Sequence, residues 1–203
     1  MSADSLASPG RPAEAQAVLD FWFGPPGDPG HLQPRRQWFE KDAAFDALIG
    51  TRFGPLIESG LAGELMSWAD ETGSALAEII VLDQFPRNLF RGTPRAFAGD
   101  SLALEAATRL VKRGADRRLS GVQRQFVYLP FEHAESMVAQ HCSMALFEQL
   151  GRDEPGLAGL LDWARRHHDI VARFGRFPHR NPILGRVSTA DEIEFLKQPG
   201  SGF

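Results

Sequence analysis

Apolar side chains recur at three- and four-residue spacing in one segment of the chain after another, and proline or glycine separates these segments. Such spacing puts the apolar side chains on one face of an α-helix. No stretch shows a run of alternating β-branched residues bounded by turns, so we expect no sheet. Short loops between about eight to nine helices predict an all-α fold, arranged as an antiparallel bundle or as stacked antiparallel helical hairpins.

Residues that start or stop helices divide the chain further. The expected helical segments are 12–24, one or two helices within 39–61, 74–86, 100–113, 120–129, 130–150, 157–174 and 189–197. Ser74 is expected to cap one helix, and Pro86 to kink or end it, because proline lacks the amide hydrogen that a helix interior uses. Pro130 suits the first turn of the next helix. That helix has little polar face and is predicted to be central.

The N-terminal residues differ in composition from the rest of the chain. Residues 1–11 are small and polar and include Pro9 and Gly10, which predicts a flexible N-terminal arm. The whole chain has 203 residues and 43% hydrophobic content, a size at which one domain can bury a continuous core. We therefore expect a single all-helical domain over 12–203.

Charge and cysteine content indicate where such a chain works. Charged residues make up 24% of the sequence and the formal net charge is −4, so neither nucleic acid nor an anionic membrane is an expected partner. No apolar run approaches the roughly 20 residues that span a bilayer, and the first residues lack signal-peptide character. The single cysteine, Cys142, cannot form an intramolecular disulfide, and we expect it to be buried and inert. A soluble, cytoplasmic protein is predicted.

Several enzyme classes lose support because their motifs are missing. The sequence has no GxxxxGK[ST] phosphate loop, no GxGxxG after a strand, no HExxH, no CxxC and no GxSxG. His133 and His141 would lie about 12 Å apart along a continuous helix, too far to share one ion. The Glu-x-x-His spacing of di-iron bundles is also missing, because Val138 lies three residues after Glu135. We expect no cofactor and no metal.

Arginine is concentrated in two loops that begin with Phe-Pro, FPRN at 85–88 and FPHRN at 177–181. The candidate ligand-binding residues are Arg87, Asn88, Arg91, Arg176, His179, Arg180 and Asn181, and Arg95 and Arg186 lie close by in the sequence. Guanidinium groups bind carboxylate or phosphate with two parallel hydrogen bonds, which favours an anion site. The alternative is that these arginines pair internally, for example Arg87 with Asp83 four residues earlier.

A second polar group, EHAE, follows Pro130. Glu132 and Glu135 are three residues apart, so in a helix they would share one face and could share a proton or hold a divalent cation. His133 beside them could act as a general base. The structural alternative is that carboxylates in a first helical turn stabilise the positive end of the helix dipole. Glu132, His133 and Glu135 are therefore candidates for acid–base chemistry that have a structural explanation as well.

Other chemically distinctive side chains are predicted to belong to the core. His167 shares a helical face with Trp163, Ile170 and Phe174, which is typical of a hydrogen-bonded core histidine. The aromatic residues of the first part of the chain have no basic stripe between them, so packing between helices explains them better than stacked bases. These residues are Phe21, Trp22, Phe23, Trp38, Phe39 and Trp68.

Several long motifs resemble one bacterial family. They are VLDFWFG at 18–24, LDQFPRNLFRGTPRAFAG at 82–99, YLPFEHAESM at 128–137, FGRFPHRNPILGR at 174–186 and PGSGF at 199–203. In this order they resemble the uncharacterised proteins known as domain of unknown function nine-two-four. The resemblance implies an all-α, tetratricopeptide-like fold and brings no reaction and no catalytic residues. The sequence itself shows no clean repeat of about 34 residues, so any repeat array would be degenerate.

Three functional hypotheses follow. The first is a helical binding protein in which the two arginine loops and the EHAE turn form one polar pocket for a small anionic molecule or an acidic peptide. The second is a hydrolase- or isomerase-type enzyme that uses Glu132, His133 or Glu135 as acid and base, with arginines such as Arg87 and Arg180 orienting an anionic substrate. The third is a protein–protein interaction scaffold without a pocket. The sequence predicts neither the oligomeric state nor the isomer of the Pro86 and Pro178 peptide bonds.

Overall fold

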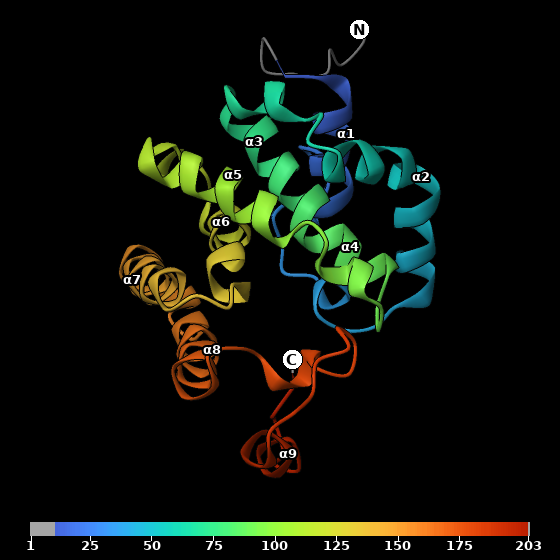
Figure 1. The fold of residues 1–203 in the computed structure, drawn as a ribbon. Coiled ribbons are helices and arrows are strands. Elements are labelled where there is room, and N and C mark those ends of the chain that lie inside the picture. The colour runs from blue at the N-terminus through green and yellow to red at the C-terminus, as the bar shows by residue number, and fades with distance from the viewer. Residues whose placement is uncertain (1–10, 203) are drawn as a thin grey trace, which may run out of the picture.

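The computed structural model describes residues 11–202, and within this range the chain forms helices and no strands (Figure 1). The helices are α1 Ala13–Phe23, α2 Ala43–Leu61, α3 Thr72–Ile79, α4 Phe85–Leu89, α5 Asp100–Lys112, α6 Gly121–His133, α7 Met137–Asp153, α8 Leu160–Phe174 and α9 Ala190–Leu196. The predicted all-α fold is confirmed. Residues 1–10 of the predicted arm lie outside the described residues.

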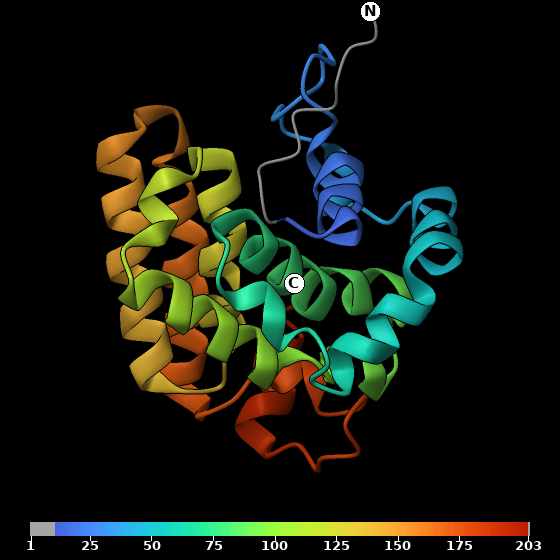
Figure 2. The same ribbon diagram turned by 90° about the horizontal axis from the view of Figure 1, so that it is seen from above.

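The helices stack as neighbours in roughly chain order. α3 contacts α1, α5 and α6, and α7 packs between α6 and α8. Seen from above, α6, α7 and α8 lie side by side at one side of the molecule, and α1 and α2 lie at the other (Figure 2). One cluster of buried apolar side chains extends from α1 to α8, and a smaller one joins the end of α8 to the segment before α9. Stacked helical hairpins describe this arrangement.

Aromatic side chains fill the centre of the larger cluster. Trp22, Trp38 and Phe126 lie with ring centroids 4.9–6.0 Å apart, mostly edge to face, a geometry that adds to the stabilisation by burial. The Trp38 indole also donates a hydrogen bond to the carbonyl oxygen of Trp22. The prediction that the aromatic residues form core is therefore confirmed for most of them. Phe39 is the exception, with 62% of its surface exposed.

Pro86 does not end a helix. Glu71 rather than Ser74 caps α3, accepting a hydrogen bond from the Ser74 amide at 2.7 Å, and its carboxylate also binds Arg11. The chain then passes through a π-helical segment, Ile80–Gln84, and Pro86 lies in the first turn of α4. A first turn tolerates proline because its amides have no partner within the helix. The described residues contain no cis peptide bond.

Pro130 does not begin a helix either. α6 starts with a capping box between Ser120 and Gln123 and continues through Pro130 to His133. The break comes at 134–136, where the side-chain amide of Gln140 donates to the carbonyl oxygens of Glu132 and Ala134. These bonds satisfy carbonyl groups that a helix end leaves unpaired. The predicted helix 130–150 is thus wrong, and its residues are shared between α6 and α7.

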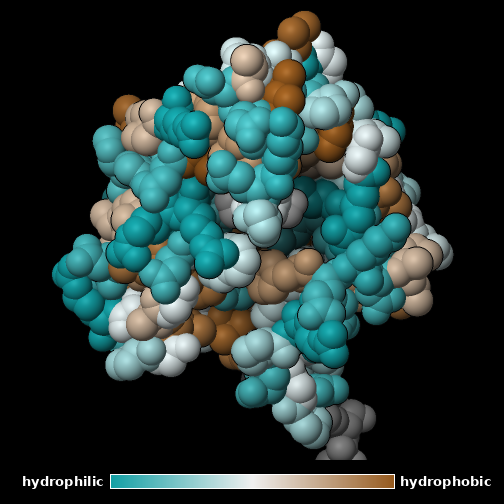
Figure 3. Space-filling model, turned by 90° about the horizontal axis from the view of Figure 1, so that it is seen from below, coloured by the Kyte–Doolittle hydropathy of each residue, from teal (hydrophilic) through white to brown (hydrophobic). Residues whose placement is uncertain are grey.

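α7 is a peripheral helix. Only one of its faces is buried, and its outer face carries Cys142 and Val138, which is 76% exposed. The predictions of a central helix and of a buried Cys142 were wrong. α7 carries apolar side chains nearly all round its axis, but its neighbouring helices cover only one of its faces. In the view from below, hydrophilic residues dominate the surface, hydrophobic ones are scattered, and the surface is hollowed near its centre (Figure 3). No helix within residues 11–202 is both long and apolar enough to cross a membrane.

Candidate functional site

A cavity of about 330 Å³ lies where three distant parts of the chain meet. They are the start of α5 with the turn before it, the loop between α6 and α7, and the segment that follows α8. Its lining residues are Pro94, Phe97, Asp100, Ser101, Leu104, His133, Ala134, Glu135, Arg180 and Leu184. We call this cavity the Arg180 pocket.

Asp100 joins the two arginine loops. One of its oxygens lies 2.8 Å from Nη1 of Arg87, and the other accepts a hydrogen bond from Nη1 of Arg180 at 3.2 Å. Asp100 is the first residue of α5, where a helix favours negative charge. The FPRN motif, which forms α4 and not the predicted loop, and the FPHRN segment after α8 therefore meet on a single carboxylate, although they are far apart in the sequence.

Arg180 is clamped inside the pocket wall. Its guanidinium carbon lies 4.7 Å from the ring centre of Phe97 and 4.6 Å from that of Phe177, and only 8% of its side chain is exposed. Burial, followed by repulsion from Arg87, lowers the pKa of Arg180 to about 10, so the group stays charged at neutral pH. Asp100 engages Nη1, and Nε is buried without a hydrogen-bond partner among the described residues. Nη2 forms no hydrogen bond among the described residues.

His133 is oriented by a buried carboxylate. Its Nδ1 lies 2.8 Å from Oδ1 of Asp83, which belongs to the π-helical segment, is fully buried and also pairs with Arg87 at 3.0 Å. Burial acts to raise the pKa of Asp83, but the positive charges of Arg87 and His133 outweigh it and lower this pKa to about 2. π-Helical turns are frequent at functional sites.

The protonation of His133 follows from its surroundings. Burial, and then the positive charge of Arg87, lower the pKa of His133 against the attraction of Asp83, so the ring is neutral at pH 7. A neutral ring beside a carboxylate carries its proton on the nitrogen that faces it, here Nδ1. Nε2 is then a proton acceptor, and His133 lines the pocket with 15% of its side chain exposed.

Glu132 faces away from the pocket. It is 3% exposed, lies in the last turn of α6, and its Oε1 is 3.0 Å from Nδ1 of His167. Burial, and then the charge of Asp83, raise the pKa of Glu132 to about 8, and burial lowers the pKa of His167 to about 3. The two groups are therefore uncharged partners at neutral pH rather than an ion pair. The prediction that His167 is a core histidine is confirmed, since its Nδ1 also lies 2.9 Å from the Trp163 carbonyl oxygen.

Glu135 lies in the loop before α7 and lines the pocket. Arg186 holds it with two hydrogen bonds, of 2.6 and 2.9 Å, and the amide of Phe177 donates to it at 2.8 Å. Burial tends to raise the pKa of Glu135, but these donors lower it, so the group is ionised. Because α6 ends between Glu132 and Glu135, the two carboxylates do not share a helical face as the sequence suggested, and the first-turn explanation fails as well.

The other predicted ligand-binding residues lie outside the pocket. Asn88 and Arg91 both bind the carboxylate of Asp46 on α2. Arg176 and Asn181 both bind Glu192, in the first turn of α9. These contacts match the alternative in which such side chains pair internally.

The remaining arginines and His179 also lie off the pocket wall. Arg95 pairs with Glu58 on the surface. The ring of His179 lies 5.7 Å from that of Phe177, and burial followed by repulsion from Arg180 lowers its pKa to about 4. Within residues 11–202, no three His, Cys, Asp or Glu side chains are grouped so that they could hold a metal ion.

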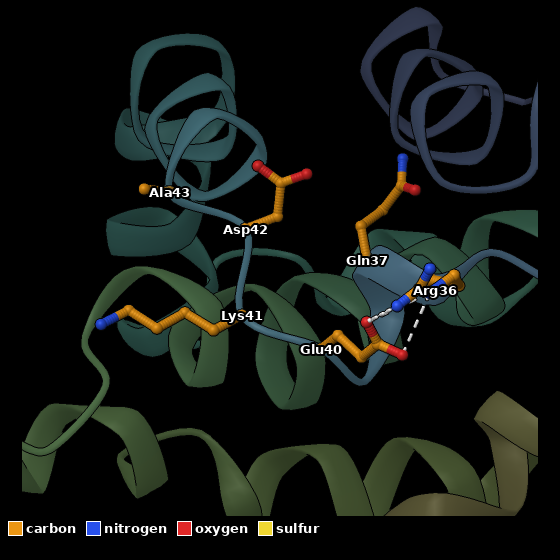
Figure 4. A pocket seen from close by; sticks show the side chains of 6 residues that line it. All are labelled: Arg36, Gln37, Glu40, Lys41, Asp42 and Ala43. Atoms are coloured by element: carbon orange, nitrogen blue, oxygen red, sulfur yellow. Dashed lines mark hydrogen bonds and ion pairs between the residues drawn. The ribbon is translucent and has the colours of Figure 1, made fainter.

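A second cavity, of about 420 Å³, is lined mostly by exposed residues. All its lining residues come from 36–43, and Figure 4 shows these side chains spread along one exposed stretch of chain. Arg36 and Glu40 pair with each other at 2.7 Å, and Asp42 caps α2. Three of its polar side chains thus have structural partners, and all of its lining comes from one short segment, so this cavity is a weaker candidate than the Arg180 pocket.

Two residues of the site were not candidates in the sequence. Asp83 was considered only as a partner for Arg87, and Asp100 only as the start of a helix. Both border the long LDQFPRNLFRGTPRAFAGD segment, 82–100, and the spacing of Asp83 and Arg87 was the available signal. The role of Asp100 had no local signal, because its partners come from two loops that only the fold brings together.

Comparisons with known proteins give a family and a fold. The profile described as "Bacterial protein of unknown function (DUF924)" matches residues 18–200. A solved structure of a protein of unknown function from Agrobacterium tumefaciens is 42% identical in sequence, covers 91% of this chain and 97% of that chain, and superposes with a TM-score of 0.80. A comparison with curated proteins found no match.

Proposed function

The chain belongs to the bacterial DUF924 family, and we propose that it binds a small molecule with an anionic group in the Arg180 pocket. The observation that carries this proposal is the state of Arg180. Its charged guanidinium group lies between two aromatic rings and borders a cavity, and of its three nitrogens only Nη1 donates a hydrogen bond among the described residues. Planar guanidinium groups held in this way recognise carboxylate and phosphate oxygens. A volume of about 330 Å³ favours a small molecule over an acidic peptide.

The test is a thermal-shift screen against small carboxylates, phosphate esters and inorganic phosphate. A ligand that binds the folded state raises the melting temperature, and at about 100 times its Kd it adds about 2.7 kcal/mol of stability. We expect at least one anion to do so, and we expect Ser101→Phe to abolish the shift. Ser101 lines the pocket but is exposed and makes no ion pair, so this change fills the cavity and leaves the folding contacts intact.

Arg180→Gln should abolish the same shift. Because Arg180 is buried, this variant will also lose stability, so ligand shifts are compared within each variant. Arg91→Gln is the matched control, since Arg91 pairs with Asp46 outside the pocket. A ligand shift that survives Arg180→Gln and Ser101→Phe would contradict the proposal, and a flat screen would favour the protein–protein scaffold.

A second candidate function is acid–base catalysis, of hydrolase or isomerase type, on the bound molecule. The observation in its favour is the pair of Asp83 and His133, in which a buried carboxylate holds Nδ1 and leaves Nε2 to accept a proton at the pocket wall. His133 would be the general base, Asp83 its positioning residue and Arg180 the group that orients the substrate. Glu132, buried away from the pocket, and Glu135, held by Arg186, are less suited to proton transfer.

Catalysis is tested by assaying the ligands found above for hydrolysis or isomerisation. His133→Gln should lower turnover about 10²–10⁴-fold, the usual contribution of a positioned base. Asp83→Asn should lower turnover while KM changes little, because the amide would favour the wrong tautomer of His133. His141→Gln, on the exposed face of α7, is the control. Turnover that is unchanged in His133→Gln would exclude this role.

We also propose that the protein is cytoplasmic and that residues 12–203 form a single domain. A small-molecule pocket built from α5, α6 and the segment after α8 needs these parts to fold together, which supports one domain. Limited proteolysis tests this organisation. Stable fragments cut between α5 and α8 would contradict it.

A further inference from the structure

The positive and negative charges around the Arg180 pocket are equal in number. They are the guanidinium groups of Arg87, Arg180 and Arg186 and the carboxylates of Asp83, Asp100 and Glu135, joined pairwise across the site. His133 and Glu132 add no charge, since burial keeps both in their neutral forms at pH 7. The site as a whole is therefore electrically neutral among the described residues.

Neutrality restricts what the pocket can hold. Arg180 is the one cation among the lining residues, and Asp100 and Glu135 line the pocket beside it. A plain anion bound to Arg180 would lie next to these two carboxylates with no positive charge left over to offset it. A ligand that brings its own positive charge avoids this repulsion.

The carboxylate of Asp100 can bind that positively charged group of the ligand. Its Oδ1 is buried and lies 2.8 Å from Nη1 of Arg87, while its Oδ2 accepts one hydrogen bond, from Arg180, and a carboxylate oxygen has about two acceptor positions. Glu135 accepts three hydrogen bonds, from Arg186 twice and from the Phe177 amide. The spare acceptor capacity is therefore at Asp100, 3.2 Å from the guanidinium group of Arg180.

Apart from His133 and Ser101, the rest of the pocket wall is apolar. Pro94, Phe97, Leu104 and Leu184 line it together with the small side chains of Ser101 and Ala134. Such a surface favours a ligand with an apolar body. The cation and the anion of the wall are adjacent, so the ligand's two charged groups must also be adjacent.

We propose that the ligand of the Arg180 pocket is a free α-amino acid with an apolar side chain, whose carboxylate binds Arg180 and whose ammonium group binds Asp100. In an α-amino acid a single carbon separates the two charged groups, which fits donor and acceptor groups that touch each other. The side chain lies against Phe97, Leu104 and Leu184. This inference rests on the proposed function, since it takes Arg180 as the group that binds the anion.

The test is isothermal titration of the full chain with the apolar amino acids, followed by matched analogues of the best binder. For leucine the analogues are 4-methylpentanoate, which lacks the amine, and 3-methylbutylamine, which lacks the carboxylate. Inorganic phosphate is the fourth probe. We expect the amino acid to bind about ten- to a hundredfold more tightly than either analogue, because each analogue leaves one charged group of the pocket unpaired.

The outcomes separate this inference from the proposed function. If 4-methylpentanoate or phosphate binds as tightly as the amino acid, the inference is wrong and anion binding stands. If only 3-methylbutylamine binds, both the amino-acid inference and the proposed anion binding are wrong. If no amino acid binds, the inference is overturned, and the fate of anion binding depends on the carboxylate and phosphate probes.

Asp100→Asn gives an independent check. The amide keeps the size of the side chain but removes the negative charge, so affinity for the amino acid should fall about ten- to a hundredfold. Affinity for 4-methylpentanoate should stay the same or rise, and this binding shows that the variant is folded. Arg91→Gln serves again as the control, with unchanged affinity for both molecules. A parallel loss of both affinities in Asp100→Asn would mean that Asp100 only supports Arg180.

Discussion

Two buried polar networks of this protein differ in how completely they are paired. In the first, the Tyr128 hydroxyl donates to Asp116 at 2.6 Å and accepts from Arg124 at 3.0 Å, and Arg124 also donates to Asp153 at 2.8 Å. None of these side chains has a buried polar atom without a partner. We call these four residues the Tyr128 network.

The second network surrounds the Arg180 pocket. Nη2 of Arg87 and Nε of Arg180 are buried without hydrogen-bond partners among the described residues. Oδ1 of Asp100 is buried with only the ion pair to Arg87, at 2.8 Å, and Arg180 and Asp100 border a cavity. Buried polar groups in folded proteins are usually paired, because an unpaired one loses its hydration without return. The closed network is explained by stability, whereas the incompletely paired one lies beside the cavity in which we propose that a ligand binds.

The largest effect we predict concerns Glu132, behind the pocket. Its pKa of about 8 in the folded protein exceeds the value near 4.5 of an unfolded chain, so the folded state holds a proton that the unfolded state loses. Stability is therefore lost as pH rises from about 4.5 to 8. Glu132→Gln cannot ionise, so at pH 8.5 it should be about 2–5 kcal/mol more stable relative to wild type than at pH 5.

Urea unfolding at pH 5 and pH 8.5 measures this difference. Glu58→Gln, a half-exposed carboxylate paired with Arg95, is the control and should show little change between the two pH values. If Glu132→Gln gains nothing at high pH, the wild-type carboxylate is ionised at neutral pH. The charge balance of the pocket would then have to be revised.

A smaller effect is expected in the Tyr128 network. Tyr128→Phe removes the hydroxyl group and leaves Asp116 and Arg124 with one partner fewer, which should cost about 1–3 kcal/mol of unfolding free energy. Burial, followed by the hydrogen bond to Asp116, raises the pKa of the Tyr128 hydroxyl well above its usual value, so the cost should be the same at pH 5 and pH 8.5. A cost that varies with pH would show that this network titrates, and the contrast with the pocket would weaken.

The smallest effect is expected at Arg91. It was a candidate ligand-binding residue in the sequence, but it pairs with Asp46 near the surface, with 35% of its side chain exposed. Partly exposed ion pairs contribute about 0–1 kcal/mol. Arg91→Gln should change the urea midpoint slightly and leave ligand affinity unchanged. Loss of affinity in this variant would extend the site toward α2.

The difference between correct and incorrect sequence predictions follows the range of the interactions involved. Thr189 starts α9 with a capping box to Glu192, and Gly175 ends α8 with a φ of 72°, which agrees with the start of the predicted segment 189–197 and the end of the predicted segment 157–174. A cap and a left-handed turn depend on a few neighbouring residues. The predicted helix end at Pro86 and the predicted helix start at Pro130 were wrong, because a π-helical segment carries the chain on into α4, and Gln140, on the next helix, binds the end of α6.

In the candidate site, too, the sequence predicted local properties correctly and missed those that depend on distant residues. The sequence picked out Arg87, Arg180 and His133 because arginine and histidine are the side chains that anion and proton chemistry need. It also picked out Asn88, Arg91 and Arg176, which turned out to pair elsewhere, since nothing local distinguishes an arginine that binds a ligand from one that binds a carboxylate.

The sequence by itself determined the all-α fold, most helix limits and the residue types that can bind an anion, because periodicity, capping and side-chain chemistry are local properties. Only the tertiary structure decided that Asp100 joins Arg87 to Arg180, that Asp83 orients His133 and that Glu132 faces His167. Each of these contacts joins residues from different helices or loops. Their pairing, burial and pKa shifts exist only once packing has brought the helices together.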